Sequence, residues 1–134
     1  MDDYNEPSSN EEYMSPRQLA YFKNKLLDWK RELNQELIQT MHHLREERWN
    51  EPDITDRANI EMDIGLELKT RSRIKKLIEK IDISLSKIQD GSYGFCEDTG
   101  EPIGVKRLEA RPIATLTIEA QERHERFERD HSKE

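Results

Sequence analysis

The sequence predicts a mainly α-helical protein, built as a long antiparallel coiled-coil hairpin followed by a small globular knuckle and a C-terminal helix. Charged residues make up 38% of the 134 residues and hydrophobic residues only 33%, which is too few for a large spherical core. Apolar residues recur at steps of three and four through residues 15–90, which is typical of amphipathic helices. Four of the five glycines lie within residues 91–104, where this periodicity ends.

The first helix is expected to follow a disordered acidic tail. Residues 1–14 are polar and aperiodic, so they form this tail. Ser15, Pro16 and Gln18 match a capping box, which predicts a helix start. The apolar stripe that follows consists of Leu19, Phe22, Leu26, Trp29, Leu33, Leu37, Met41 and Leu44. This stripe predicts one amphipathic helix of about 30 residues.

A turn near residues 50–57 is expected to reverse the chain, because Pro52 disfavours helical geometry before it. The second stripe, interrupted at Arg71, consists of Ile60, Ile64, Leu68, Ile74, Ile78, Ile81, Leu85 and Ile88. Gly91 can end this helix in a left-handed conformation. Two helices of matching length joined by a short turn pack antiparallel to cover their stripes. Residues 15–90 therefore predict a coiled-coil hairpin with its tip near 50–57.

Two aspartates lie beside the predicted tip. Asp53 and Asp56 are three residues apart, so both carboxylates can project from the end of the hairpin. They could bind a hard cation, contact basic protein groups, or act only as caps favoured by the helix dipole. A two-helix tip has no pocket walls that exclude water, so acid–base catalysis is not expected there. We therefore do not expect an enzyme.

The charge distribution limits the kinds of partner. A net charge of −7 disfavours nucleic acid as the main partner, because phosphate binding needs clustered cations. An acidic protein is better suited to a basic protein surface or channel. The basic run on the second helix can be a solvated face or an anion-binding patch, and it comprises Lys69, Arg71, Arg73, Lys75, Lys76 and Lys80.

The sequence has one cysteine and no apolar run that could span a bilayer. Both observations fit a cytoplasmic protein without internal disulfides.

The segment 91–116 is expected to be a compact knuckle, and Thr117 can cap a last helix over residues 117–134. The knuckle's apolar residues are few, namely Phe95, Ile103, Val105, Leu108, Ile113 and Leu116. A core of this size needs a metal, disulfides or packing against a neighbouring element.

Several strings in the sequence carry a resemblance to a known family. They are EEYM (11–14), PDITDRA (52–58), SYGFCEDTGEPIG (92–104) and KRLEARP (106–112). With them the sequence resembles the DksA/TraR family of RNA polymerase-binding transcription factors, from Glu11 to about Gln121. The resemblance implies a monomer that binds RNA polymerase and not DNA, and that inserts its coiled-coil tip into the secondary channel. It also implies joint action with ppGpp in the stringent response, repressing ribosomal RNA promoters and activating some biosynthetic promoters.

The resemblance also assigns roles to residues. The tip positions near the polymerase active site match Asp53, Asp56 and Ala58, and Arg73 matches a polymerase contact. The family's ppGpp-binding positions match Leu77, Lys80 and Arg111, whereas a further family lysine falls on Gln121. No cofactor is expected to be bound stably, with ppGpp acting as a co-regulator.

The resemblance breaks at the zinc site. Family members hold zinc with two Cys-x-x-Cys pairs, and the matching positions are Cys96, Thr99, Thr117 and Ala120. Threonine hydroxyls are poor zinc ligands and alanine is none. We therefore expect a degenerate zinc-finger-like knuckle without zinc, whose folding is insensitive to chelators. Cys96 is then either a small core residue or a redox sensor.

Two alternative functions remain open on the sequence. A Gre-like transcript cleavage factor also carries an acidic tip on a coiled coil, and it would need the tip carboxylates to bind a catalytic metal. A purely structural coiled-coil adaptor would explain the apolar stripes and the charge, but it would not need the acidic pair at the tip.

Overall fold

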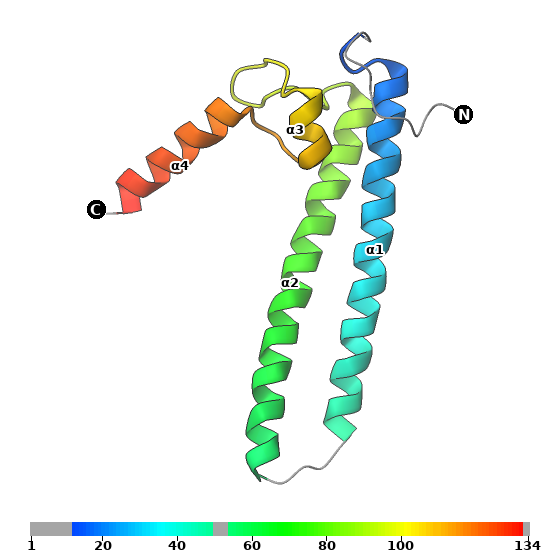
Figure 1. Cartoon of the computed structure of the whole chain (residues 1–134), viewed down its shortest axis with the longest axis vertical. Coiled ribbons are helices and arrows are strands. Elements are labelled where there is room, and N and C mark those ends of the chain that lie inside the picture. Colours follow the sequence, from blue (N-terminus) through cyan, green and yellow to red (C-terminus); the bar gives the residue numbers. More distant parts are fainter. Residues whose placement is uncertain (1–11, 50–53, 133–134) are drawn as a thin grey trace. The chain divides into compact units, whose positions relative to one another are not determined.

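The structure is a computed structural model that describes residues 12–49 and 54–132 (Figure 1). Its helices are α1 (Pro16–Trp49), α2 (Ile54–Asp90), α3 (Val105–Ala110) and α4 (Ile118–Ser132). Within the described ranges, the β structure is limited to one isolated antiparallel bridge between Phe95 and Pro102. The predicted mainly helical fold class is confirmed. None of the helices, as far as they are described, is long and apolar enough to cross a membrane.

The predicted capping box starts α1. The backbone N–H of Gln18 donates to Ser15 Oγ at 3.2 Å, and Gln18 Oε1 accepts from the backbone N–H of Met14 at 2.7 Å. The first bond satisfies a backbone donor that the first helical turn leaves without a partner. The second bond holds Met14, which precedes the N-cap residue, while the Ser15 N–H donates to Glu12 O at 3.1 Å. The local sequence therefore sets where the helix begins.

The described residues divide into two compact units. Unit 1 comprises Met1–Leu26 and Ile83–Glu134, and unit 2 comprises Leu27–Asp82. The predicted hairpin, residues 15–90, is thus shared between the units, because the start of α1 and the end of α2 pack with the knuckle in unit 1. Each unit is described by itself below.

Unit 2 is an antiparallel pair of helices, formed by the later part of α1 and the earlier part of α2. Lys30 Nζ pairs with Asp82 Oδ1 at 2.7 Å, and His43 Nδ1 pairs with Glu67 Oε1. The later residue of α1, His43, pairs with the earlier residue of α2, Glu67, so the two helices run antiparallel. The buried apolar residues of this pair include Leu33, Ile74 and Ile81.

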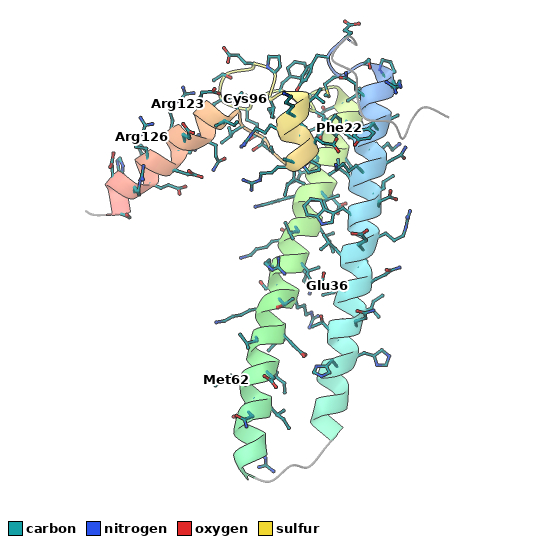
Figure 2. The ribbon with its side chains drawn as sticks, viewed as in Figure 1. Phe22, Glu36, Met62, Cys96, Arg123 and Arg126 are labelled. Carbon is teal, nitrogen blue, oxygen red and sulfur yellow. The ribbon has the colours of Figure 1, made fainter. Side chains whose placement is uncertain are left out.

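Unit 1 has the larger share of the buried core. Tyr93 lies at its centre with a side chain that is only 2% exposed. The Tyr93 ring lies 5.8 Å from the Phe22 ring of α1, and its hydroxyl donates to the backbone oxygen of Pro112 at 2.7 Å. Further buried residues of this unit include Leu26, Cys96, Ile103, Leu108 and Ala120. Figure 2 labels Phe22 on α1 and Cys96 in the knuckle. The knuckle therefore packs on the base of the two long helices, as a core of this size requires.

The structure departs from the predicted tail at Tyr13 and Met14. The Tyr13 hydroxyl donates to Gly94 O at 2.6 Å and accepts from the backbone N–H of Gly104 at 3.0 Å. Gly94 has a φ of +91°, and a Cβ there would lie 2.9 Å from Met14 Cγ, so only glycine fits. Both contacts join residues about 80 or more positions apart in the chain. The polar composition of the tail therefore could not predict them.

The knuckle also contains a helix that the sequence analysis did not predict. α3 is only six residues long, and it presents buried Leu108 to the core. The backbone N–H of Leu108 donates to Gly104 O at 3.1 Å and that of Arg111 donates to Arg107 O at 2.7 Å. A helix this short leaves too few positions for a 3.6-residue period to be recognised.

Candidate functional site

The predicted tip is described only in part. Asp53 lies outside the described residues, whereas Asp56 and Ala58 belong to the first two turns of α2. A carboxylate in the first turn of a helix is favoured by the partial positive charge of the helix N-terminus. The position of Asp56 in the sequence of α2 therefore suits an acidic residue.

A cationic face runs along α2 within unit 2. Its members are Lys69, Arg73, Lys76 and Lys80, which are all exposed. They recur at steps of four, three and four, so they lie on one side of the helix. Together with Ser72 and Leu77 they line a shallow surface hollow of about 330 Å³. This face can bind an anionic ligand or an acidic protein surface.

Arg71 is part of the basic run in the sequence but does not belong to this exposed face. Its side chain is half-buried, and its buried Nε has no hydrogen-bond partner in the described part of the chain. Glu67, one turn earlier, pairs with His43 of α1. At the point where Arg71 interrupts the apolar stripe, α2 therefore carries partly buried polar side chains, Glu67 and Arg71.

The positions predicted to bind ppGpp fall in both units. Leu77 is half-buried and Lys80 is exposed, and both belong to unit 2. Arg111 is exposed in unit 1, directly after α3. Gln121, which matches a further predicted ppGpp-binding position, donates to Glu125 Oε1 at 3.2 Å within α4. Each of the two cations is accessible, and Gln121 adds no positive charge.

The structure brings the four degenerate zinc positions together around Cys96. Cys96 Sγ accepts from the backbone N–H of Thr117 at 3.5 Å and lies 3.9 Å from the Thr117 hydroxyl. Thr117 Oγ1 also accepts from the backbone N–H of Ala120 at 3.2 Å, as an N-cap of α4. Thr99 donates a hydrogen bond to Cys96 as well, and Ala120 is fully buried. A thiol and two hydroxyl groups thus form a hydrogen-bonded cluster.

This cluster does not fit a four-thiolate zinc site. It offers one sulfur, and the Thr117 hydroxyl is already engaged in capping, while Ala120 has no donor atom. Structural zinc needs four such ligands in a tetrahedral arrangement. In the described ranges, no group of three or more His, Cys, Asp or Glu side chains could replace them.

Hydrogen bonding changes the acidity of the Cys96 thiol. Burial raises its pKa, but hydrogen bonds from the Thr99 hydroxyl and from the backbone N–H groups of Thr117, Thr99 and Asp98 outweigh burial and lower the pKa to about 7. These donors stabilise the thiolate more than the thiol. The cluster is therefore held together most tightly when Cys96 is ionised.

A second polar cluster in unit 1 has no counterpart in the sequence analysis. Glu109 Oε1 accepts from the Tyr21 hydroxyl at 2.6 Å and pairs with Lys25 Nζ at 2.6 Å. Burial raises the pKa of Glu109, but its hydrogen bonds with Lys25 and Tyr21 outweigh burial and lower it. This cluster joins α1 to α3. A sequence separation of more than 80 residues leaves no spacing pattern that could reveal it.

Comparisons with known proteins agree with this arrangement. Residues 18–88 match the family model of the DnaK suppressor protein DksA, N-terminal domain. Residues 91–126 match the model of the prokaryotic dksA/traR C4-type zinc finger, although the chain has a single cysteine. The knuckle is thus similar to a zinc finger from which three of the four sulfur ligands are missing.

Similar proteins cover most of the chain. The RNA polymerase-binding transcription factor DksA of Caulobacter vibrioides is 58% identical over 125 residues, which are 93% of this chain and 88% of the relative. The protein of the same name from Escherichia coli K12 is 46% identical over 109 residues, covering 81% and 72%. The solved structure of transcription factor DksA2 from Pseudomonas aeruginosa superposes with a TM-score of 0.84 at 38% identity, covering 90% of this chain and 95% of that one.

Proposed function

Because the chain belongs to the DksA family, we propose that it regulates transcription by binding RNA polymerase directly. The observation that carries this proposal is the similarity of both parts of the chain, residues 18–88 and 91–126, to the two models of the family. The relatives at 46% and 58% identity are named transcription factors that bind RNA polymerase, and not enzymes. A non-enzymatic regulator of polymerase is therefore the function that the comparisons support best.

The hairpin tip is the part that we propose enters the secondary channel of the polymerase. Asp53, Asp56 and Ala58 then approach the active site and change the stability of the open complex. Open complexes at ribosomal RNA promoters become shorter-lived, and some biosynthetic promoters are activated. Arg73 on the exposed cationic face of α2 contributes to docking.

The nucleotide ppGpp is the proposed co-regulator, bound where the chain meets the polymerase. Lys80 and Arg111 each supply an exposed cation, which a ligand with several phosphate groups needs. Leu77 lies beside Lys80 and provides apolar contact. Gln121 supplies no charge, so the response to ppGpp rests on fewer cations than in family members with a lysine there.

The knuckle is proposed to hold its shape without zinc, through the Cys96 cluster and its packing in unit 1. We further propose a cytoplasmic monomer that does not contact DNA directly, in line with the net charge of −7. No cofactor is then bound stably, and ppGpp acts as a co-regulator at the interface with the polymerase.

The test is in vitro transcription from a ribosomal RNA promoter, with open-complex lifetime measured against protein concentration, with and without ppGpp. The double variant Asp53→Asn/Asp56→Asn should bind polymerase like the wild type, but the open complex should live as long as it does without the protein. The control variant Asp63→Asn, also on α2, should shorten the open-complex lifetime as much as the wild type does. Unchanged regulation in the tip variant would contradict the proposed role of the carboxylates and favour an adaptor. Stimulated RNA cleavage in backtracked complexes would favour a Gre-like factor instead.

A second measurement addresses ppGpp. Lys80→Ala/Arg111→Ala should reduce the additional effect of ppGpp while the effect of the protein alone remains. The matched control is Lys75→Ala/Lys106→Ala, which removes two other exposed lysines. Full synergy in the first double variant would refute the assignment of these two cations.

A further inference from the structure

A second hollow lies on α2 within unit 2, beside the cationic face. Its volume is about 400 Å³, and it is lined by Leu68, Arg71, Ser72, Lys75, Lys76 and Glu79. These positions recur at steps of three and four, so they lie on one side of the helix. Ser72 and Lys76 also line the first hollow, whereas Arg71 and Lys75 line only the second of the two. This second hollow, called the Arg71 hollow, is therefore a separate candidate for a ligand site.

Arg71 is the least exposed of the cations in this hollow. Its side chain is half-buried, and its buried Nε has no hydrogen-bond partner among the residues that the structure describes. The carboxylate one turn earlier, Glu67, pairs with His43 of α1. A partly desolvated cation without a counter-ion interacts more strongly with an anion than a fully hydrated one does. Burial also restricts the side chain, so less conformational entropy is lost when Arg71 binds a ligand.

Two lysines add further positive charge to the hollow. Lys75 and Lys76 are both exposed, and neither forms an ion pair with a residue in the described ranges, in contrast to Lys30 with Asp82. Glu79 is the one carboxylate among the six lining residues, so three cations and one carboxylate leave a net charge of +2. A single carboxylate from a partner would not neutralise this charge, whereas an anion with two or more charges would.

The donor groups of the hollow suit a phosphate group. A guanidinium can donate two parallel hydrogen bonds to phosphate oxygens, and the hydroxyl of Ser72 can donate a further one. From Arg71 to Lys76 the helix rises about 8 Å, a distance that flexible lysine side chains can span around one or two phosphate groups. Leu68 is 47% exposed and offers an apolar contact to the organic part of such a ligand.

We propose that Arg71, Ser72, Lys75 and Lys76 bind a small phosphorylated molecule in the Arg71 hollow. Arg71 makes the bidentate contact with a phosphate group, and the two lysines neutralise its remaining charge. A nucleic-acid strand is not the expected occupant, because the net charge of −7 opposes a long polyanion. The chain binds the ligand on its own, so the inference does not rest on binding to RNA polymerase.

The test titrates the full-length chain with pyrophosphate by isothermal titration calorimetry, in about 0.15 M salt so that exposed charges are screened. Pyrophosphate should bind at least about tenfold more tightly than citrate, which carries a similar charge at neutral pH on carboxylates and not on phosphate groups. Equal affinities for the two anions would show that the hollow attracts charge without recognising phosphate. Either that result or no binding of pyrophosphate would overturn the proposal.

A pair of double variants locates the site. Arg71→Gln/Lys75→Gln should weaken pyrophosphate binding at least about tenfold, because it removes two of the three cations. The matched control Arg57→Gln/Lys106→Gln removes the same residue types at two exposed positions outside the hollow, and it should change the affinity by less than about threefold. Similar losses in the two double variants would mean that net charge, and not the hollow, determines binding.

An NMR titration of the wild type does not depend on the folding of any variant. Pyrophosphate should shift the backbone amide signals of residues 68–79 more than those of the rest of the chain, and shifts that leave Ser72 unchanged would refute the site. If Arg73→Gln/Lys80→Gln lost binding while Arg71→Gln/Lys75→Gln kept it, the anion would occupy the cationic face, and the proposal would be wrong.

A last comparison identifies the kind of ligand. A single-stranded oligonucleotide that bound more tightly than pyrophosphate would show that nucleic acid is the occupant, and would refute a small phosphorylated ligand. None of these titrations contains polymerase. Their failure would leave the proposed function unaffected, and a chain that did not bind polymerase could still bind pyrophosphate in the Arg71 hollow.

Discussion

Replacing Tyr93 with phenylalanine should destabilise unit 1 without changing its shape. The Tyr93 side chain is 2% exposed, and its hydroxyl makes a 2.7 Å hydrogen bond to the backbone oxygen of Pro112. Burial raises the pKa of Tyr93, so the phenol remains a protonated donor at all physiological pH values. In Tyr93→Phe the ring keeps its contact with Phe22, but the buried oxygen of Pro112 loses its donor. The expected loss is about 1–3 kcal/mol in the free energy of unfolding.

Urea denaturation followed by circular dichroism measures this loss. A chain of this length should also unfold about 4 °C lower for each kcal/mol lost. The control is Phe127→Leu, because Phe127 is 61% exposed on α4 and should change stability by less than about 0.5 kcal/mol. Equal stability of Tyr93→Phe and the wild type would refute the view that this hydrogen bond holds the segment after α3 to the core.

Three further predictions concern the cluster that occupies the zinc positions. Thr117→Ala removes the N-cap of α4, so it should cost about 1 kcal/mol and increase amide hydrogen exchange in α4, whereas Thr40→Ala on α1 should change neither. Because the pKa of Cys96 is about 7 in the folded state against an ordinary value of 9.0, the folded chain binds this proton more weakly. The free energy of unfolding should therefore rise from pH 7 to 9, and this contribution should be lost as the pH falls through 7. The variant Cys96→Ala should lack this rise. If the free energies of unfolding of the wild type and the variant changed in parallel with pH, the Cys96 thiolate would not stabilise the fold. EDTA should leave the helical signal and the unfolding midpoint unchanged, and a lowered midpoint would indicate a structural metal.

The fold class could be predicted because its signals are local. The capping box at Ser15 and the two apolar stripes depend on residues three and four positions apart, and the helices that carry the stripes are α1 (Pro16–Trp49) and α2 (Ile54–Asp90). The antiparallel pairing follows from covering these stripes, and the pairs Lys30 with Asp82 and His43 with Glu67 report it. Periodicity thus determined the long elements of this chain.

The contacts that organise unit 1 could not be predicted in the same way. Tyr13 binds two glycines of the knuckle, and Glu109 binds Tyr21 and Lys25 of α1. These pairs are separated by more than 80 residues, so the pairing depends on tertiary packing and not on local propensity. The basic run on α2 could be recognised in the sequence. The exposure of Met62 and Leu66 on the same helix could not be predicted from it.

The loss of three sulfur ligands changes how the knuckle is stabilised. In a structural zinc site the free energy of metal binding contributes directly to folding, and the finger can be stable with few contacts to its surroundings. Here Cys96 and Thr117 supply only hydrogen bonds, each of which contributes about 1 kcal/mol. The remaining stability must come from packing against the long helices, which Phe22 on Tyr93 and Lys25 on Glu109 provide. The knuckle and the base of α1 and α2 should therefore unfold together, because neither the hydrogen-bonded cluster nor the small apolar core suffices alone.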